Sequence, residues 1–198
     1  MTERPEELET RKSLLLRLKD RADESAWHEF HGLYAPLIYN YARARGLPHD
    51  DAEEIRSDCL VTVVKQMPTF DYDPQKGRFK AWLRTIVVRR IADRLRKRAE
   101  PQAGTEQLYL ITSQDETSDE IWESEWRDQH LRTCMDHARS HVNDQTWAIF
   151  QMLVDDGLDV AEICRRMNVA ANLVYKARAR VLELVRSRMA YLEASDAV

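Results

Sequence analysis

Apolar side chains recur every three or four positions through much of the first hundred residues, which is the spacing of one face of an α-helix. The first clear pattern runs from Trp27 to Tyr41, and Asp23 or Ser25 can serve as its N-cap. Pro36 falls inside this pattern and has no backbone N–H, so we expect it to divide or kink the helix.

A second helical pattern begins after Gly46 and Pro48, with Asp50 as the expected cap. Acidic residues fill its first turn, where the helix dipole favours negative charge. Residues 68–77 contain several turn formers and are predicted to be a loop, after which the helical pattern resumes with Trp82 and Ile86. The apolar stripe of the second helix consists of Ala52, Ile55, Cys59, Val63 and Met67.

The C-terminal half is also helical in pattern. Residues 99–119 show no sustained period and are expected to form a flexible acidic linker, and helices are predicted over about 119–142 and 145–154. Asp159 stands three residues before Glu162, as in a capping box, and a short turn at 168–171 precedes a long helix with Asn172 as its expected cap. The core stripe of this last helix is Val174, Ala177, Val181 and Val185.

Composition supports an all-α fold. The chain has 198 residues, 43% of them apolar and 32% charged, and only 5 Gly and 6 Pro, which disfavours a turn-rich β protein. No run approaches the roughly 18 apolar residues of a membrane span, so we expect a cytoplasmic protein without membrane insertion. Cys59, Cys134 and Cys164 lie far apart and are predicted to be reduced core residues.

The charges are distributed unevenly along the chain, although the net charge is only -4. Lys76 to Arg98 contains ten basic residues and one acid, whereas Glu100 to Asp128 contains nine acids and one base. Arg165 to Arg188 is basic again, with seven bases and one acid. This order of basic, acidic and basic segments predicts contact with a polyanion at two places.

The C-terminal basic segment has the form of a helix-turn-helix, because two helices are joined by a tight turn and the second has a basic outward face. Such a helix fits the major groove, where its first turns reach base edges and its cations neutralise phosphates. The alternative is an αα-hairpin with a solvated basic face. The predicted DNA-binding residues on this helix are Asn172, Tyr175, Lys176 and Arg180.

The central basic segment predicts a second nucleic-acid surface, since each neutralised phosphate releases counterions. Aromatic side chains beside such a surface can stack on unpaired bases. Phe70 and Tyr72 lie in the predicted loop and are the better stacking candidates, whereas Phe79 and Trp82 occupy helical apolar positions and are expected in the core.

One cluster contains zinc ligand types: His130, Cys134, His137 and His141 share a flank of one predicted helix. A straight helix spreads these four positions over about 16 Å, too far for one ion, so we expect ordinary packing and no metal. No glycine-rich phosphate loop or hydrolase motif is present in the sequence, and we therefore expect no cofactor and no enzymatic activity.

Two stretches resemble a known family. Residues 13–98, which contain the phrase GRFKAWLRTI before the basic helix, resemble region two of bacterial RNA polymerase sigma factors of the extracytoplasmic-function (ECF) group of the sigma-70 family. Residues 156–189, DGLDVAEICRRMNVAANLVYKARARVLELVRSRM, resemble region four. The resemblance implies two small helical domains, region two at 10–98 and region four at 120–192, joined by the linker at 99–119.

The resemblance also implies a function. It predicts a sigma factor that directs core RNA polymerase to promoters and assists promoter melting, with an anti-sigma factor as a further partner to consider. Region two would bind the β′ clamp helices and the unpaired minus-ten element, and region four the duplex minus-thirty-five element and the β flap. The implied polymerase-binding residues are Asp51, Glu53, Glu54, Ser57 and Asp58. The implied single-strand-binding residues are Phe70, Tyr72, Lys76, Arg78, Lys80, Arg84, Arg89 and Arg90.

Two other hypotheses remain at this point. A stand-alone, dimeric helix-turn-helix regulator would bind symmetric half-sites on duplex DNA without polymerase. A small metal-dependent nucleic-acid hydrolase would use His130, Cys134 and His137 as ligands, which the distance along the helix disfavours.

Overall fold

The computed structural model describes residues 13–70, 79–98 and 116–196, and every regular element in these ranges is helical. The all-α prediction is therefore confirmed. The chain divides into two compact units, Met1–Gln129 together with Glu193–Val198, and His130–Leu192. The predicted linker at 99–119 lies mostly outside the described residues, and the next helix, α7 (Glu116–Ser140), begins within its last four positions.

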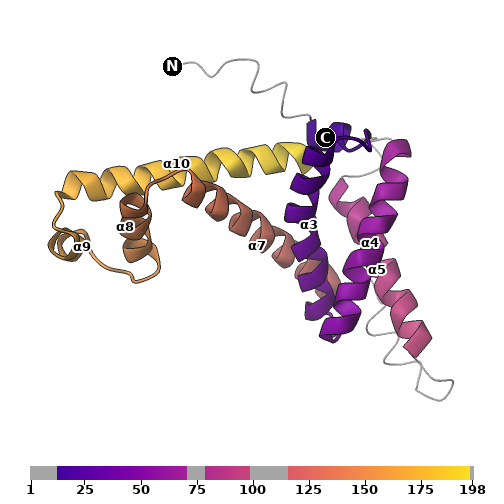
Figure 1. Ribbon diagram of the computed structural model, residues 1–198. Helices are drawn as coiled ribbons and strands as arrows, with labels where there is room; N and C mark the ends of the chain where they lie inside the picture. The colour runs from indigo at the N-terminus through magenta and orange to yellow at the C-terminus, as the bar shows by residue number, and fades with distance from the viewer. Residues whose placement is uncertain (1–12, 71–78, 99–115, 197–198) are drawn as a thin grey trace. The chain divides into compact units, whose positions relative to one another are not determined.

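The first unit is built on three long helices, α3 (Glu24–Ala44), α4 (His49–Gln66) and α5 (Phe79–Arg98), which pack alongside one another (Figure 1). The short helix α2 (Ser13–Arg17) precedes them, and a 3₁₀ turn, η2 (Met67–Thr69), follows α4. The apolar stripes predicted from the sequence face this core. Its buried residues include Phe30, Tyr34, Leu37, Ile38 and Tyr41 on α3, Ala52, Ile55, Cys59 and Val63 on α4, and Phe79, Leu83, Val87 and Ile91 on α5.

The first turns of α7 belong to the same unit, because their tryptophans complete its aromatic core. Trp122 is 1% exposed and meets Tyr41 edge-on, with ring centroids 5.0 Å apart. Trp126 lies 5.6 Å from Tyr34. The buried hydroxyls of Tyr41 and Ser118 are hydrogen-bonded at 2.8 Å, which satisfies both polar groups inside the core.

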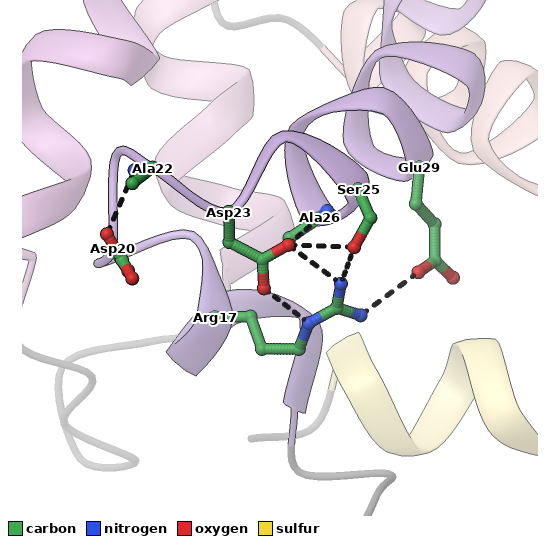
Figure 2. Close-up of polar contacts among 7 residues, drawn as sticks. All are labelled: Arg17, Asp20, Ala22, Asp23, Ser25, Ala26 and Glu29. Carbon is green, nitrogen blue, oxygen red and sulfur yellow. Dashed lines mark hydrogen bonds and ion pairs between the residues drawn. The ribbon is translucent and has the colours of Figure 1, made fainter.

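A polar cluster joins α2 to the start of α3 (Figure 2). The Asp23 carboxylate caps α3 by accepting a hydrogen bond from the Ala26 N–H at 2.9 Å, which confirms one of the two predicted caps. Arg17 donates two bonds to the same carboxylate, at 2.8 and 3.0 Å, and also contacts Ser25 and Glu29. The hydrogen bonds from Arg17 lower the pKa of Asp23 below its usual range.

The predicted division at Pro36 and the predicted cap at Asp50 are both wrong. The helix α3 is not divided at Pro36, because buried residues on both sides of the proline, Leu33 and Leu37 among them, pack into one core and outweigh the lost hydrogen bond. Asp50 does not cap α4, which begins one residue earlier, at His49. Pro48 precedes it with φ −64° and makes no side-chain cap, while Asp50 lies in the first turn.

The second unit contains the end of α7, α8 (Asp144–Val154), α9 (Val160–Met167) and the main part of α10 (Ala171–Asp196). Asn143 caps α8. Its core joins these helices through Ile149, Ile163, Val174 and Ala177, with a neighbouring cluster of Ala138, Phe150 and Val181. The predicted stripe of the last helix therefore faces the core.

The turn between α9 and α10 follows the predicted form with one correction. Asp159 caps α9 by accepting from the Glu162 N–H at 2.7 Å, as predicted. Asn168 ends the helix in the left-handed conformation, with φ 51°. The helix α10 then begins at Ala171, so Asn172 lies in its first turn and is not its cap.

All three cysteines are free thiols, and Cys59 and Cys134 are fully buried, as predicted. Within the described ranges, no helix has the length and apolar character needed to cross a membrane.

We predict that Asp23→Ala lowers the melting temperature by about 2 to 4 °C, because it removes both the cap and the partner of Arg17. Asp23→Asn should cost less, since an asparagine can still cap the helix. The contribution of the carboxylate is present above about pH 4 and is lost as the pH falls toward its lowered pKa. The gap between wild type and Asp23→Asn should therefore close in acid, as measured by circular dichroism. Equal melting temperatures for the two proteins at pH 7 would contradict a stabilising role for the Arg17 pair.

Candidate nucleic-acid and partner interfaces

The helix α5 presents basic side chains on several sides while its apolar stripe faces the core. Arg84 and Lys80 lie next to α7, and Arg90 and Arg94 lie next to α4. Arg89 is exposed. The basic residues predicted as one surface from the sequence are thus divided by the fold into groups with different neighbours.

Arg94 forms an ion pair in the interface between α4 and α5. Its guanidinium donates to Asp51 Oδ1 at 2.8 and 3.1 Å and to Glu54 Oε1 at 2.7 Å. The Asp51 side chain is 2% exposed, and its hydrogen bond raises the pKa of Arg94. Asp51, a predicted polymerase-binding residue, therefore lies in the core and holds the two helices together.

Arg90 also bonds across this interface, donating to the Thr62 hydroxyl at 2.9 Å. Thr62 in turn donates to the Asp58 carbonyl one helical turn earlier, at 2.7 Å. Beside them, burial raises the pKa of the Cys59 thiol to about 12, so it stays protonated and unreactive at neutral pH.

The first turns of α5 are paired with acids of α7. Lys80 Nζ lies 2.6 Å from Glu123 Oε2 and 5.1 Å from the ring centroid of Trp126. Arg84 pairs with Asp119 and lies 3.5 Å from the Ser118 hydroxyl. The sequence signal for this pairing was the acidic segment that follows the basic one, but the partners could not be assigned from spacing.

Phe70 directly follows η2 and lies in an aromatic cluster with the start of α5. Its ring centroid is 4.5 Å from that of Trp82 and 6.2 Å from that of Phe79. Phe79 is fully buried, as predicted, while Trp82 and Phe70 are half-buried. The predicted DNA-binding residues Tyr72, Lys76 and Arg78 lie outside the described residues.

The helix α4 carries an exposed stripe on the side away from the core. Glu54, Ser57 and Asp58 lie on it, and Glu53 beside them is half-buried and paired with Arg56. Sequence analysis missed its apolar continuation, Val61 at 50% and Val64 at 40% exposure. These valines stand four and seven positions after Ser57, and that helical spacing was the signal that could have identified them.

Next to Val64, a pocket of about 490 Å³ opens between α3 and α4. Trp27, His28, His31 and Leu60 also line it. The α4 stripe therefore combines acidic, polar and apolar groups, a composition that suits a protein partner better than a nucleic acid.

The second unit presents the predicted helix-turn-helix face. Asn172, Tyr175, Lys176 and Arg180 are all exposed on α10, and Tyr175 is 57% exposed. Arg180 lies 3.2 Å from Glu183 on the same helix. The structure thus places the four residues on a solvent-facing side of a helix whose other side is the core.

The histidine cluster does not converge on one point. His130 and Cys134 are buried. His137 lies further along α7 and His141 directly follows the end of that helix, with the two ring centroids 4.0 Å apart. Burial lowers the pKa of His137, and the neighbouring His141 and Arg188 act in the same direction. Within the part of the chain that the structure describes, no three metal-ligating side chains are arranged to hold an ion.

Comparison with known proteins finds a family match within the first unit. The family described as Sigma-70 region 2 matches residues 31–100, which cover most of α3 and all of α4 and α5. The ECF RNA polymerase sigma factor RpoE of Cereibacter sphaeroides is 26% identical over 119 residues, a stretch that covers 60% of this chain and 64% of that protein. The match thus spans less than two thirds of that relative. The ECF RNA polymerase sigma factor SigK of Mycolicibacterium vanbaalenii is 29% identical over 163 residues, or 80% of this chain and 78% of that protein.

We predict that Arg94→Ala lowers the melting temperature by about 5 to 10 °C, because it removes the cation that accompanies the buried Asp51 carboxylate. Arg96→Ala is the matched control, since Arg96 is 62% exposed and pairs with Asp93 on its own helix. It should shift the melting temperature by no more than about 1 °C. Adding Asp51→Asn to Arg94→Ala should restore part of the loss, and no recovery would show that the charge of Asp51 is not the cause.

Proposed function

We propose that the chain is a member of the ECF group of the sigma-70 family, and that it directs core RNA polymerase to particular promoters and assists their melting. The observation that carries the proposal is the Sigma-70 region 2 match over residues 31–100. These residues include the exposed α4 stripe and the basic helix α5, so a protein-binding side and a cationic side occur on one small domain.

The polymerase contact, in this proposal, is the α4 stripe formed by Glu53, Glu54, Ser57 and Asp58, which binds the β′ clamp helices. Val61 extends the stripe with an exposed apolar side chain, whose burial against a partner would add to binding. Asp51 contributes indirectly, because its bond to Arg94 holds α4 against α5.

The unpaired minus-ten strand binds, in this proposal, at the other side of the domain. Phe70 supplies an aromatic face, and stacking of a base on such a ring contributes about 1 to 3 kcal/mol. That energy helps to offset the few kcal/mol that unstacking each base step costs. The cations proposed to bind the strand are Lys76, Arg78, Lys80, Arg84, Arg89 and Arg90, with Tyr72 as a second aromatic.

The duplex minus-thirty-five element binds the helix-turn-helix, with Asn172, Tyr175, Lys176 and Arg180 at base edges and phosphates. Region four, predicted at 120–192, also contacts the β flap, and the acidic segment at 99–119 connects it to region two, at 10–98. Residues 120–129 of this range pack with the first unit, so the compact part of region four is His130–Leu192. The proposed mechanism consists of differential binding of duplex and unpaired promoter DNA. In this proposal the protein works in the cytoplasm with core polymerase, without catalytic residues or a cofactor of its own. An anti-sigma factor is a further proposed partner.

The stand-alone dimeric regulator is not favoured. Both relatives are named as sigma factors, and the family match falls on the N-terminal unit rather than on the helix-turn-helix. A simple regulator has no need of a polymerase-binding domain of this kind.

We expect the purified chain to bind core RNA polymerase and to start transcription at defined positions. Co-purification followed by run-off transcription from genomic fragments measures both activities. Failure to bind core enzyme, combined with binding to palindromic duplex DNA unaided, would overturn the proposal in favour of the dimeric regulator.

The two proposed surfaces should be separable by mutation. Lys176→Ala with Arg180→Ala should weaken binding to upstream duplex DNA and reduce its salt dependence, while binding to core polymerase stays unchanged. Asp58→Lys should weaken binding to core polymerase and leave binding to the duplex unchanged. Arg186→Ala, on another side of α10, is the control for loss of a single exposed cation. Fluorescence anisotropy with labelled duplex and with labelled core enzyme gives both affinities, and equal loss of both in either variant would contradict separate surfaces.

A further inference from the structure

We propose that the start of α7 inhibits the single-strand-binding surface of α5 in the free protein. The carboxylates of Asp119 and Glu123 form ion pairs with Arg84 and Lys80, respectively. A nucleic-acid strand must displace these carboxylates before it reaches the two cations. This inference rests on the proposed function, since it concerns the cations assigned there to the unpaired strand.

The relative exposure of the paired side chains carries the argument. The side chains of Glu123 and Asp119 are 53% and 61% exposed, whereas those of Lys80 and Arg84 are 21% and 18% exposed. The carboxylates therefore lie on the solvent side of each pair, with the cations behind them. A strand that approaches α5 here meets negative charge first, and its phosphates are repelled.

The acids are held in place by packing and not by their charges alone. Trp122 lies between Asp119 and Glu123 in the sequence of α7, and Trp126 follows Glu123. The two tryptophans are 1% and 4% exposed. These two indoles bury this side of the helix against Tyr41 and Tyr34, which fixes the helix over the start of α5. The pairs are thus presented by a docked helix, unlike an ordinary surface pair between two mobile side chains.

The chemistry of the contact matches that of a nucleic-acid backbone. A carboxylate and a phosphate accept the same hydrogen bonds from a guanidinium or ammonium group, so the two compete for one set of donors. A pocket of about 470 Å³ opens beside the pairs, lined by Lys80, Arg84, Thr85, Asp119 and Glu123. Single-stranded DNA is the ligand that fits, because α5 presents further exposed cations and the Phe70 ring on the same domain.

The direct test compares charge-neutral variants of the full chain in their binding to a labelled oligothymidylate of about 16 nucleotides. Asp119→Asn, Glu123→Gln and the double variant should bind more tightly than wild type, the double variant by about 2- to 25-fold, because each exposed pair is worth about 1.4- to fivefold in affinity. Two added phosphate contacts should also steepen the dependence of log affinity on log salt by about 1.4.

Glu120→Gln is the matched control. It removes the same charge from the same turn of α7, at an exposed position outside the pairs with Lys80 and Arg84. It should leave the salt dependence unchanged. A double variant that binds no more tightly than Glu120→Gln would overturn the inference. Thermal unfolding and tryptophan fluorescence establish that each variant keeps α7 docked through Trp122 and Trp126.

A second pair of variants separates failure of this inference from failure of the proposed function. Lys80→Ala with Arg84→Ala, introduced into the acid-neutralised double variant, should abolish its gain in affinity. Should these alanines weaken binding in wild type while the acid variants show no gain, the surface is real and only the inhibition is refuted. Should the alanines change nothing in either background, Lys80 and Arg84 do not bind single strands, and that part of the proposed function is wrong.

Discussion

The first unit depends on an aromatic core in which three helices meet. Phe79, the first residue of α5, packs against Tyr34 of α3 with ring centroids 5.3 Å apart, and Trp126 of α7 packs against the same tyrosine at 5.6 Å. Large rings bury much apolar surface and have few rotamers, so they fix the positions of the helices that carry them. The starts of α5 and α7 are therefore held together at Tyr34, and every charged contact between them follows from that packing.

As a consequence, the basic residues of α5 have different neighbours and different roles. Arg94 and Arg90 serve the fold, because they bond to Asp51 and Thr62 across the interface with α4. Lys80 and Arg84 face the acids of α7 instead. Arg89 is exposed. A high local charge in a sequence is thus no direct measure of the charge that a ligand meets, since ion pairs within the fold neutralise part of it.

The second unit also depends on apolar packing between helices. Val174 and Val181 of α10 pack with Ile163 and Phe150, and this packing turns the opposite side of the helix to solvent. Local signals define the turn before it, because Asn168 tolerates the left-handed conformation and Asp159 caps the preceding helix. The exposed face of α10 therefore depends on contacts among the three consecutive helices α8, α9 and α10.

Much of the fold could be predicted from local pattern. The period of apolar residues identified every helix from α3 onward that the structure describes, but not the short α2. Asp159 was correctly predicted as a cap, and Asp23 was one of two candidates for the cap of α3. The errors at Pro36, Asp50 and Asn172 concern single residues at which packing or a neighbouring residue outweighed a local preference. Helix ends are the least determined part of such a pattern, because shifts of one residue there change the free energy little.

The sequence by itself determined that the chain is helical, that its charge is segregated into blocks, and that residues 31–100 match the Sigma-70 region 2 family. Only the tertiary structure decided which charges meet. Arg94 and Asp51 are 43 residues apart in the chain, as are Lys80 and Glu123, and Tyr41 bonds to Ser118 over 77 residues. Helical spacing relates residues three or four positions apart, whereas pairings over such distances depend on how the aromatic core docks whole helices against one another.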